Sequence, residues 1–277
     1  MGHREIALMK LADRKLTVMR KPKQSPRQRF NKFIQTTTRK IKLRWFRLRG
    51  GQIVNFLHIP KTGGSAVKNA IGNNLSTKQY KVHLRGHSCH LKEIPKGDKF
   101  FFFLRDPAQR FISAFNHKKS GKKRWKHKKF AEETAALARF QTANDLAESL
   151  SSDCEETKQA AVAAMNCIEH VNTFYLDWFY SQEYFLSRLP DALYIGFQES
   201  LDQDFLALMQ ILKLPNVTHL PARDSLEANK NSAALSTELT QTANENLKVW
   251  YADDYDFLRL CQEKAPDVLA NYQRGPA

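Results

Sequence analysis

The chain has 277 residues, a formal net charge of +16 and 42% hydrophobic residues. This length exceeds one ordinary domain and falls short of two, so we expect a single large domain with an appendage. The hydrophobic content and the 18 phenylalanines exclude a globally disordered chain. The longest stretch without Asp, Glu, Lys or Arg is residues 50–60, too short for a transmembrane helix of about 20 apolar residues.

The positive charge is concentrated in two segments. Residues 1–49 hold 16 Lys and Arg against two acidic residues, and residues 117–130 hold eight and no acidic residue. The rest keeps 20 basic and 26 acidic residues, a charge of about −6. We predict a basic N-terminal arm over 1–49 and one folded domain over 50–277, which is mildly acidic outside the basic run 117–130. The arm is either a mobile or peripheral segment, or an anchor for an acidic lipid or polysaccharide surface.

The start of the sequence and its cysteines favour a cytoplasmic protein. The first residues, MGHREIALMK, lack a long apolar run, which predicts no secretory signal. The four cysteines form no C-x-x-C pair and predict neither a zinc site nor a disulfide framework: Cys89, Cys154, Cys167 and Cys261. A reducing cytoplasm is the simplest compartment for such a chain.

Two strand-and-helix units are expected in the first half of the domain. Residues 53–59 form an apolar, β-branched run that ends at a proline, as a buried parallel strand does, and a helix is expected over 66–71. The second unit has an apolar strand over 100–104, and Pro107 is placed to open the helix that follows.

The second half predicts one more strand and much helix. A strand is expected over 193–197 and an amphipathic helix over 201–212, with further helix over 131–188 and 236–262. Strands that alternate with helices predict an α/β fold with a mostly parallel sheet, covered by helices on both faces.

The segment Lys61-Thr62-Gly63-Gly64-Ser65 lies between the first strand and its helix and is typical of an anion site. A glycine turn there collects backbone N–H groups at the positive end of the helix dipole. The lysine adds a charge, and the two hydroxyls add donors. A turn with a solvated lysine is the alternative.

The second unit adds another candidate for anion binding. Arg105 follows a buried strand, and Ser113 lies a little over two helical turns further on. Ligands of open α/β sheets lie outside the carboxyl ends of the strands, so this pair suits a second anionic group. For Arg110 we expect a structural ion pair with Asp106.

Both motifs resemble those of the sulfotransferases that use 3′-phosphoadenosine-5′-phosphosulfate (PAPS). Residues 58–65, HIPKTGGS, resemble the 5′-phosphosulfate loop, and residues 104–113, LRDPAQRFIS, resemble the 3′-phosphate motif. Weaker likenesses follow at 194–201 and 250–255, so the resemblance spans roughly residues 52–263. It is nearest to the carbohydrate group that includes the heparan 2-O-sulfotransferases.

The resemblance implies a P-loop-like fold. It also implies the in-line transfer of a sulfonate from PAPS to a hydroxyl group of a carbohydrate, a reaction that needs no metal ion. It implies 5′-phosphosulfate binding by Lys61, Thr62, Gly63, Gly64 and Ser65, and 3′-phosphate binding by Arg105 and Ser113. Charge develops on the leaving phosphate oxygen, which makes Lys61 a catalytic candidate as well.

The resemblance also implies a general base. In the family a Gly-His pair shortly before the second motif supplies it, and His87 stands in that place. Some relatives carry another histidine two residues earlier, where this chain has Arg85. Alternatively, His87, Cys89 and His90 are loop residues or metal ligands, although such crowded ligands fit zinc poorly. For His58, inside the first strand, we expect either a core role with its polar groups paired or a supporting position behind the site residues.

Two other classes of function stay open from the sequence. A non-catalytic module would bind nucleic acid or an acidic polymer through 1–49 and 117–130. A nucleotide kinase or another phosphoryl transferase would also use an anion loop, but Lys61 precedes the glycines, unlike the Walker A order. The sulfotransferase hypothesis expects no nucleic acid; it expects the basic loop with Trp125 to attract an anionic acceptor.

Overall fold

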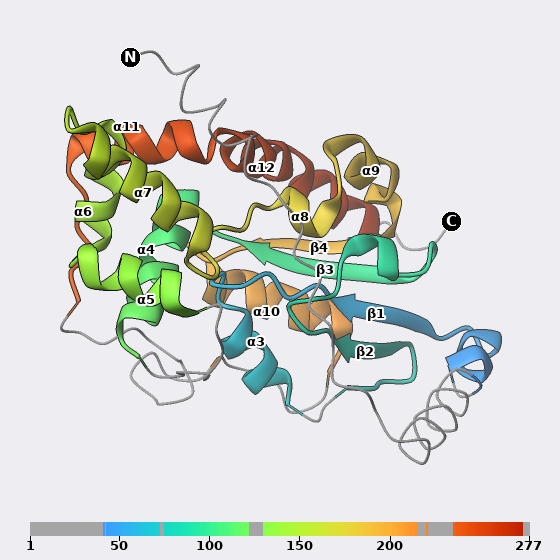
Figure 1. The fold of residues 1–277 in the computed structure, drawn as a ribbon. Coiled ribbons are helices and arrows are strands. Elements are labelled where there is room, and N and C mark those ends of the chain that lie inside the picture. Colours follow the sequence, from blue (N-terminus) through green and yellow to red (C-terminus); the bar gives the residue numbers. More distant parts are fainter. Residues whose placement is uncertain are drawn as a thin grey trace.

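The structure, a computed structural model, describes residues 41, 43–72, 75–121, 130–214, 220 and 235–273. A four-stranded sheet with the order β2-β1-β3-β4 forms the centre of the molecule. All neighbouring strands of this sheet are parallel, so their carboxyl ends lie at one end of the sheet (Figure 1). The strands are β1 (Gln52–Phe56), β2 (Tyr80–Leu84), β3 (Lys99–Leu104) and β4 (Ala192–Phe197).

Helices cover both faces of the sheet (Figure 1). One face is covered by α3 (Gly64–Ile71) and α10 (Leu201–Leu212), and the other by α8 (Leu176–Phe179), α9 (Gln182–Ser187) and α12 (Ala252–Gln273). The remaining helices are α4 (Pro107–Lys119), α5 (Phe130–Arg139), α6 (Ala143–Glu148), α7 (Glu155–Cys167) and α11 (Gln241–Trp250). Short 3₁₀ turns lie at η1 (Leu91–Glu93), η2 (Ser149–Ser151) and η3 (Leu189–Asp191).

The phenylalanine run of β3 explains why both faces need a cover. Successive residues of a strand point to opposite faces, so an unbroken apolar run has to be buried twice. Phe101 and Phe103 pack with α3 and α10, whereas Phe100 and Phe102 pack with α8, α9 and α12. This run therefore fixes β3 in the interior of the sheet.

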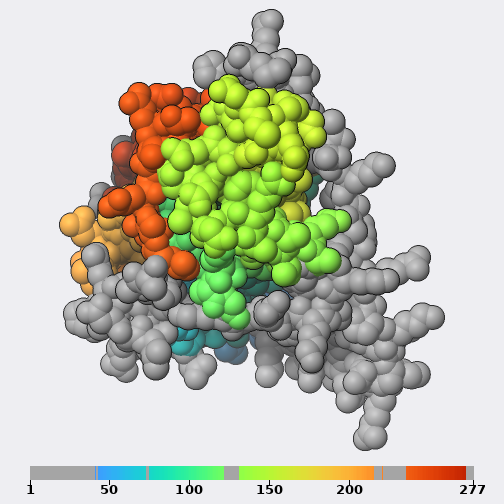
Figure 2. All heavy atoms as spheres, turned by 60° about the vertical axis from the view of Figure 1, so that its left-hand side comes forward, coloured from blue at the N-terminus to red at the C-terminus, as the bar shows by residue number. Residues whose placement is uncertain are grey.

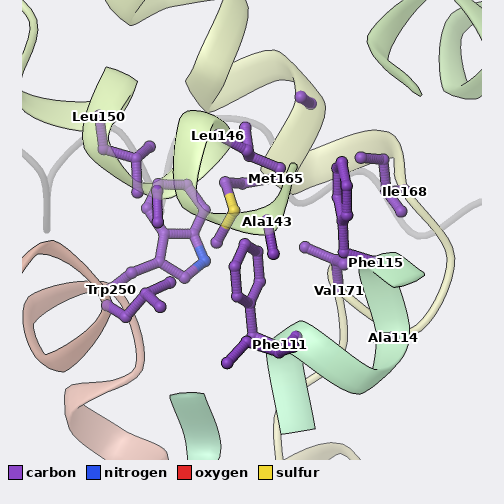
Figure 3. Packing of buried hydrophobic residues seen from close by; sticks show 14 of the residues in the cluster. Phe111, Ala114, Phe115, Ala143, Leu146, Leu150, Met165, Ile168, Val171 and Trp250 are labelled. Carbon is purple, nitrogen blue, oxygen red and sulfur yellow. The ribbon is translucent and has the colours of Figure 1, made fainter. Parts of the chain in front are cut away.

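The helices α4–α7 and α11 form a helical lobe beyond the carboxyl ends of the strands (Figure 1). In Figure 2, α5–α7 (green to yellow-green) lie side by side with α11 (orange-red) at this end of the molecule. The lobe has its own core, in which Phe111, Met165 and Trp250 point toward one another (Figure 3). The carboxyl ends of the strands thus lie against a second packed body.

The fold class expected from the sequence is confirmed, and the element bounds differ in instructive places. The expected strand over 53–59 is β1, which ends at Phe56, because the last residue that β2 pairs with it is Leu84. Leu57 continues the pairing with one bond, its N–H donating to the Phe101 carbonyl at 2.9 Å. The helix expected from Ala66 begins two residues earlier, because Gly63 takes the left-handed conformation and caps it.

The edge strand β2 was not predicted. Its sequence, YKVHL, alternates apolar and polar residues, with Tyr80 and Val82 buried. This alternation is the pattern of a strand with one side partly exposed, and it was a usable signal. Because β2 pairs with β1, the segment 85–87 emerges beside the glycine loop.

The helical stretches expected over 131–188 and 236–262 are broken into shorter helices. Between α5 and α6 the chain restarts at Thr142, whose hydroxyl accepts from the Asp145 N–H while the Asp145 carboxylate accepts from the Thr142 N–H. In the second stretch, Tyr251 separates α11 from α12, and α12 continues to Gln273.

Two predicted regions lie largely outside the described residues. Residues 1–40 of the basic arm and 122–129 of the basic loop, with Trp125, are not described. Among the helices that are described, none combines the length and the apolar character that a membrane crossing requires.

Candidate functional site

Three predicted site residues follow the carboxyl ends of three adjacent strands. Lys61 comes after β1, His87 after β2 and Arg105 after β3. Because these strands are neighbours and parallel, the topology brings residues from separate motifs to one place between the sheet and the helical lobe.

The glycine loop owes its shape to left-handed backbone and close packing. Lys61 and Gly63 have positive φ angles of 67° and 83°. Gly64 lies under the ring of His58, and a Cβ there would be only 2.2 Å from the ring. The Thr62 hydroxyl donates to the Ile59 carbonyl at 3.0 Å, so it braces the loop, although the sequence predicted a ligand donor. Such a loop leaves the first N–H groups of α3 facing outward.

Lys61 lies among other cations. Burial, followed by the charges of Arg105 and Lys118, lowers the pKa of Lys61 to about 8. Lys118, on α4, forms ion pairs with Glu133 and Glu169, whereas the charges that shift the pKa of Lys61 are positive. Partly buried cations that gather beside a helix N-terminus favour an anionic ligand there.

Arg105 is held by its backbone and keeps part of its guanidinium unpaired. The Tyr175 hydroxyl donates to the Arg105 carbonyl and accepts from the Arg105 N–H at 3.2 Å. The Nε of Arg105 is buried and has no hydrogen-bond partner among the described residues. Burial lowers the pKa of Arg105, partly offset by Glu199 and Tyr175. A buried donor without a hydrogen-bond partner destabilises the folded protein unless a ligand accepts its hydrogen bond.

The helix that carries Ser113 begins directly after Arg105. The Asp106 carboxylate caps α4 by accepting from the Gln109 N–H at 2.9 Å, and the Asp106 N–H donates to Glu199 at 2.8 Å. Ser113 lies half-buried in the middle of α4. The strand end and the helix start are thus one rigid unit.

Arg110 has a different partner from the one expected. It pairs with Asp254 of α12 at 2.9 Å rather than with Asp106, and both side chains are almost completely buried. It also donates to the Thr173 carbonyl at 2.5 Å. The structural role predicted for Arg110 therefore holds, but Asp106 is committed to capping α4.

The ring of His87 is oriented by the backbone. Its Nδ1 lies 3.1 Å from the His58 carbonyl, which can only accept, so Nδ1 carries the proton and Nε2 is left with a free lone pair. Trp178 donates to the His87 carbonyl at 2.8 Å. Partial burial lowers the pKa of His87, with the bond to His58 acting in the opposite direction. His87 is therefore a neutral base at pH 7.

His58 lies behind His87 and is buried. The two rings have centroids 4.0 Å apart, and His58 also stacks on Phe56. Burial, and then His87, lowers the pKa of His58 to about 2. The buried position of His58 matches the prediction. Its Nδ1 has no hydrogen-bond partner among the described residues, although we expected its polar groups to be paired.

His170 is a third histidine at this place, and the sequence analysis missed it. It comes from the connection between α7 and α8, and its ring centroid is 5.9 Å from that of His87. Burial lowers the pKa of His170 to about 4, with Glu169 opposing. No pattern in the sequence marks it, because only the packing of the helical lobe brings it to the strand ends.

The alternative of a metal site at 87–90 has no support in the geometry. His90 donates from Nδ1 to the Asp177 carbonyl at 2.5 Å, and the Cys89 thiol points to the His90 carbonyl. Over the part of the chain that the structure covers, there is no group of three or more His, Cys, Asp or Glu that could hold a metal ion.

A strand, a glycine loop and a helix N-terminus, with cations from the next strand end, define a class of group-transfer enzymes that bind phosphate-like anions. The chain matches the sulfotransferase family over residues 46–260, and it belongs to that family. This family includes the heparan sulfate 2-O-sulfotransferases and generally takes its sulfonate from PAPS. No curated protein matches the chain.

The site residues fit a PAPS-like donor. Such a molecule carries a sulfonated phosphate at one end and a separate phosphate at the other, so it needs two anion sites. The loop with Lys61 offers one, and the unpaired Nε of Arg105 offers a donor for the other. Gly63 and Gly64 let the loop backbone pack against Leu201 and His58, since a Cβ at these positions would be only 2.7 and 2.2 Å from those side chains.

Proposed function

We propose that this protein transfers a sulfonate from PAPS to a hydroxyl group of a carbohydrate, with His87 as the general base. The loop from Lys61 to Ser65 holds the 5′-phosphosulfate, and Arg105 with Ser113 holds the 3′-phosphate. The observation that carries the proposal is the buried, unpaired Nε of Arg105 beside the cationic glycine loop.

The residues divide the chemistry between them. Nε2 of His87 takes the proton of the acceptor hydroxyl while its oxygen forms a bond to sulfur, and the bond between sulfur and the phosphate oxygen breaks. Lys61 and the N–H groups at the start of α3 stabilise the charge that develops on that phosphate oxygen. The proton stays on His87 until solvent removes it, so atoms and charges balance without a metal.

Several observations support an anionic carbohydrate as the acceptor. In addition to burial, the charge of Lys68 lowers the pKa of His58 and His87, that of Lys61 lowers the pKa of His87 and His170, and that of Lys118 lowers the pKa of His170. Such a field attracts acidic polymers and raises their rate of encounter. The likeness to carbohydrate sulfotransferases favours a sugar hydroxyl. All four cysteines are free thiols, which fits our proposal of a cytoplasmic enzyme.

Donor binding is tested with 3′-phosphoadenosine-5′-phosphate (PAP), the desulfated donor, against Mg·ATP in a thermal-shift assay. PAP at 100 times its Kd should add about 2.7 kcal/mol of stability, and ATP much less. Lys61→Ala and Arg105→Ala should remove most of the PAP shift. Lys99→Ala is the matched control, because Lys99 lies at the amino end of β3 and donates to the Pro190 carbonyl.

Turnover is tested separately from binding. His87→Ala should lose about 10²–10⁴ in sulfonate transfer and keep the PAP shift. Stabilisation by Mg·ATP alone would point to a phosphoryl transferase. Indifference to PAP, together with steeply salt-dependent binding of nucleic acid, would favour a basic binding module and overturn the proposal.

A further inference from the structure

His170 holds an unusual backbone conformation next to the proposed base. Its φ angle is +71°, a region that residues other than glycine rarely occupy. Backbone of this kind concentrates at functional sites, where the surrounding structure maintains it. The conformation is therefore a reason to ask what the side chain does.

The chain on both sides of His170 is fixed. The Glu169 N–H donates to Glu133 at 2.9 Å, and the Thr173 hydroxyl donates to the His170 carbonyl at 3.1 Å. Val171 is fully buried in the core of the helical lobe. These contacts hold the left-handed turn, and together they present the ring of His170 to that of His87.

The ring itself is only partly covered and is not used by the fold. Within the region that the structure describes, no hydrogen bond engages its nitrogens. The charged groups around it are Glu169 next to it, Lys118 on α4, and Lys61 on the glycine loop. With a pKa of about 4, the imidazole is neutral at pH 7 and still has one N–H to donate.

The hydroxyl of the acceptor needs more than one partner. During the reaction its proton goes to His87 and one lone pair attacks sulfur, which leaves a second lone pair free. We propose that His170 is a second catalytic imidazole, which donates a hydrogen bond to this remaining lone pair and so aims the oxygen at sulfur. A neutral N–H suits this task, because it orients the oxygen without giving up its proton.

This inference rests on the proposed function and deepens it. His170 comes from the helical lobe, whereas Lys61, His87 and Arg105 follow strands. The acceptor would then be held between the two bodies of the molecule, with the donor on the sheet side.

The test compares two substitutions that both tolerate the left-handed backbone. His170→Gly removes the ring, and His170→Asn keeps a neutral N–H donor. Lys213→Gly is the matched control, because Lys213 has a φ angle of +50° at the end of α10 and is exposed. The probes are PAP for binding, and PAPS with heparosan, chondroitin or water as acceptor for turnover.

We expect His170→Gly to lose about 10²-fold in turnover, as for other lost donors to a reacting oxygen, and His170→Asn to stay within about tenfold of wild type. Both variants should keep the PAP shift. The double variant His87→Ala/His170→Gly should lose far less than the product of the single losses, because both residues act on one oxygen. A residue that only supports the position of His87 could show the same coupling, but it would not be rescued by the amide donor of His170→Asn.

Different failures have different meanings. Full turnover by His170→Gly with normal PAP binding overturns the inference and leaves the proposed function intact. Equal losses in His170→Gly and His170→Asn also overturn it, because the hydrogen bond is then not what matters. A wild-type chain that neither binds PAP nor consumes PAPS overturns the proposed function, and the inference with it.

Discussion

Lys61 and His87 need opposite protonation states for the proposed transfer, and their surroundings provide them. Lys61 has to be charged to hold the donor, yet burial and neighbouring cations lower its pKa to about 8. His87 has to be neutral to accept a proton, and partial burial lowers its pKa below the ordinary 6.5. Between these two values both residues are in their working state.

A bell-shaped dependence of kcat/KM on pH follows from these two shifts. The acid limb, where His87 becomes protonated, should lie at a lower pH than the ordinary histidine value, and near pH 8 the rate should fall as Lys61 loses its charge. Initial rates of sulfonate transfer at low donor concentration measure this profile. In Lys61→Arg the alkaline limb should disappear, because arginine stays charged. A wild-type profile without the alkaline limb would contradict the Lys61 assignment, and an acid limb above pH 6.5 would contradict the His87 assignment.

At the scale of elements, Tyr175 holds the end of β3 in place. Its hydroxyl engages both backbone groups of Arg105, and its own N–H donates to Asp254 at 2.8 Å. Arg110, which pairs with Asp254, also lies over the Tyr175 ring. The position of Arg105 therefore depends on Tyr175, which directly precedes α8, and on the contacts of Tyr175 with α4 and α12.

Tyr175→Phe should weaken PAP binding by up to about 30-fold, because Arg105 loses two backbone bonds worth about 1 kcal/mol each. Tyr80→Phe is the matched control. The hydroxyl of Tyr80 bonds to Tyr272 at 2.9 Å near the amino end of β2, so its removal should lower stability without changing PAP affinity. Isothermal titration measures the PAP affinity of both variants. Equal affinities would show that the hydrogen bonds between the Tyr175 hydroxyl and Arg105 do not matter for PAP binding.

The elements around the site differ in how far the sequence alone could predict them. Local pattern was enough for the glycine loop, for β3 and for α10, since each is a contiguous run with its own signal. The partner of Arg110 was not predictable, because Asp254 lies on α12, far along the chain, and only the tertiary fold brings it near α4. The same applies to His170, which no motif marks.

At the scale of the whole molecule, the site lies where the three cores of the protein meet. The helical lobe has one core, and each face of the sheet has another. The net charge of +16 has little to do with this place, since most of it belongs to residues 1–49 and 117–130. The proposed chemistry depends on a few partly buried charges. They lie in the part of the chain outside these two segments, whose net charge is mildly negative.

Buried histidine also makes the stability of the whole protein sensitive to acid. The folded state keeps His58 neutral, with a pKa of about 2, whereas the unfolded chain protonates it near pH 6.5. The stability is therefore fully present above pH 6.5, and each pH unit below costs about 1.4 kcal/mol from His58 alone. His58→Phe keeps the stack on Phe56 and the carbonyl that orients His87, and removes the titration. Its free energy of unfolding, measured by urea denaturation, should match wild type at pH 8 and fall less steeply between pH 6.5 and 5; parallel curves would refute the assignment.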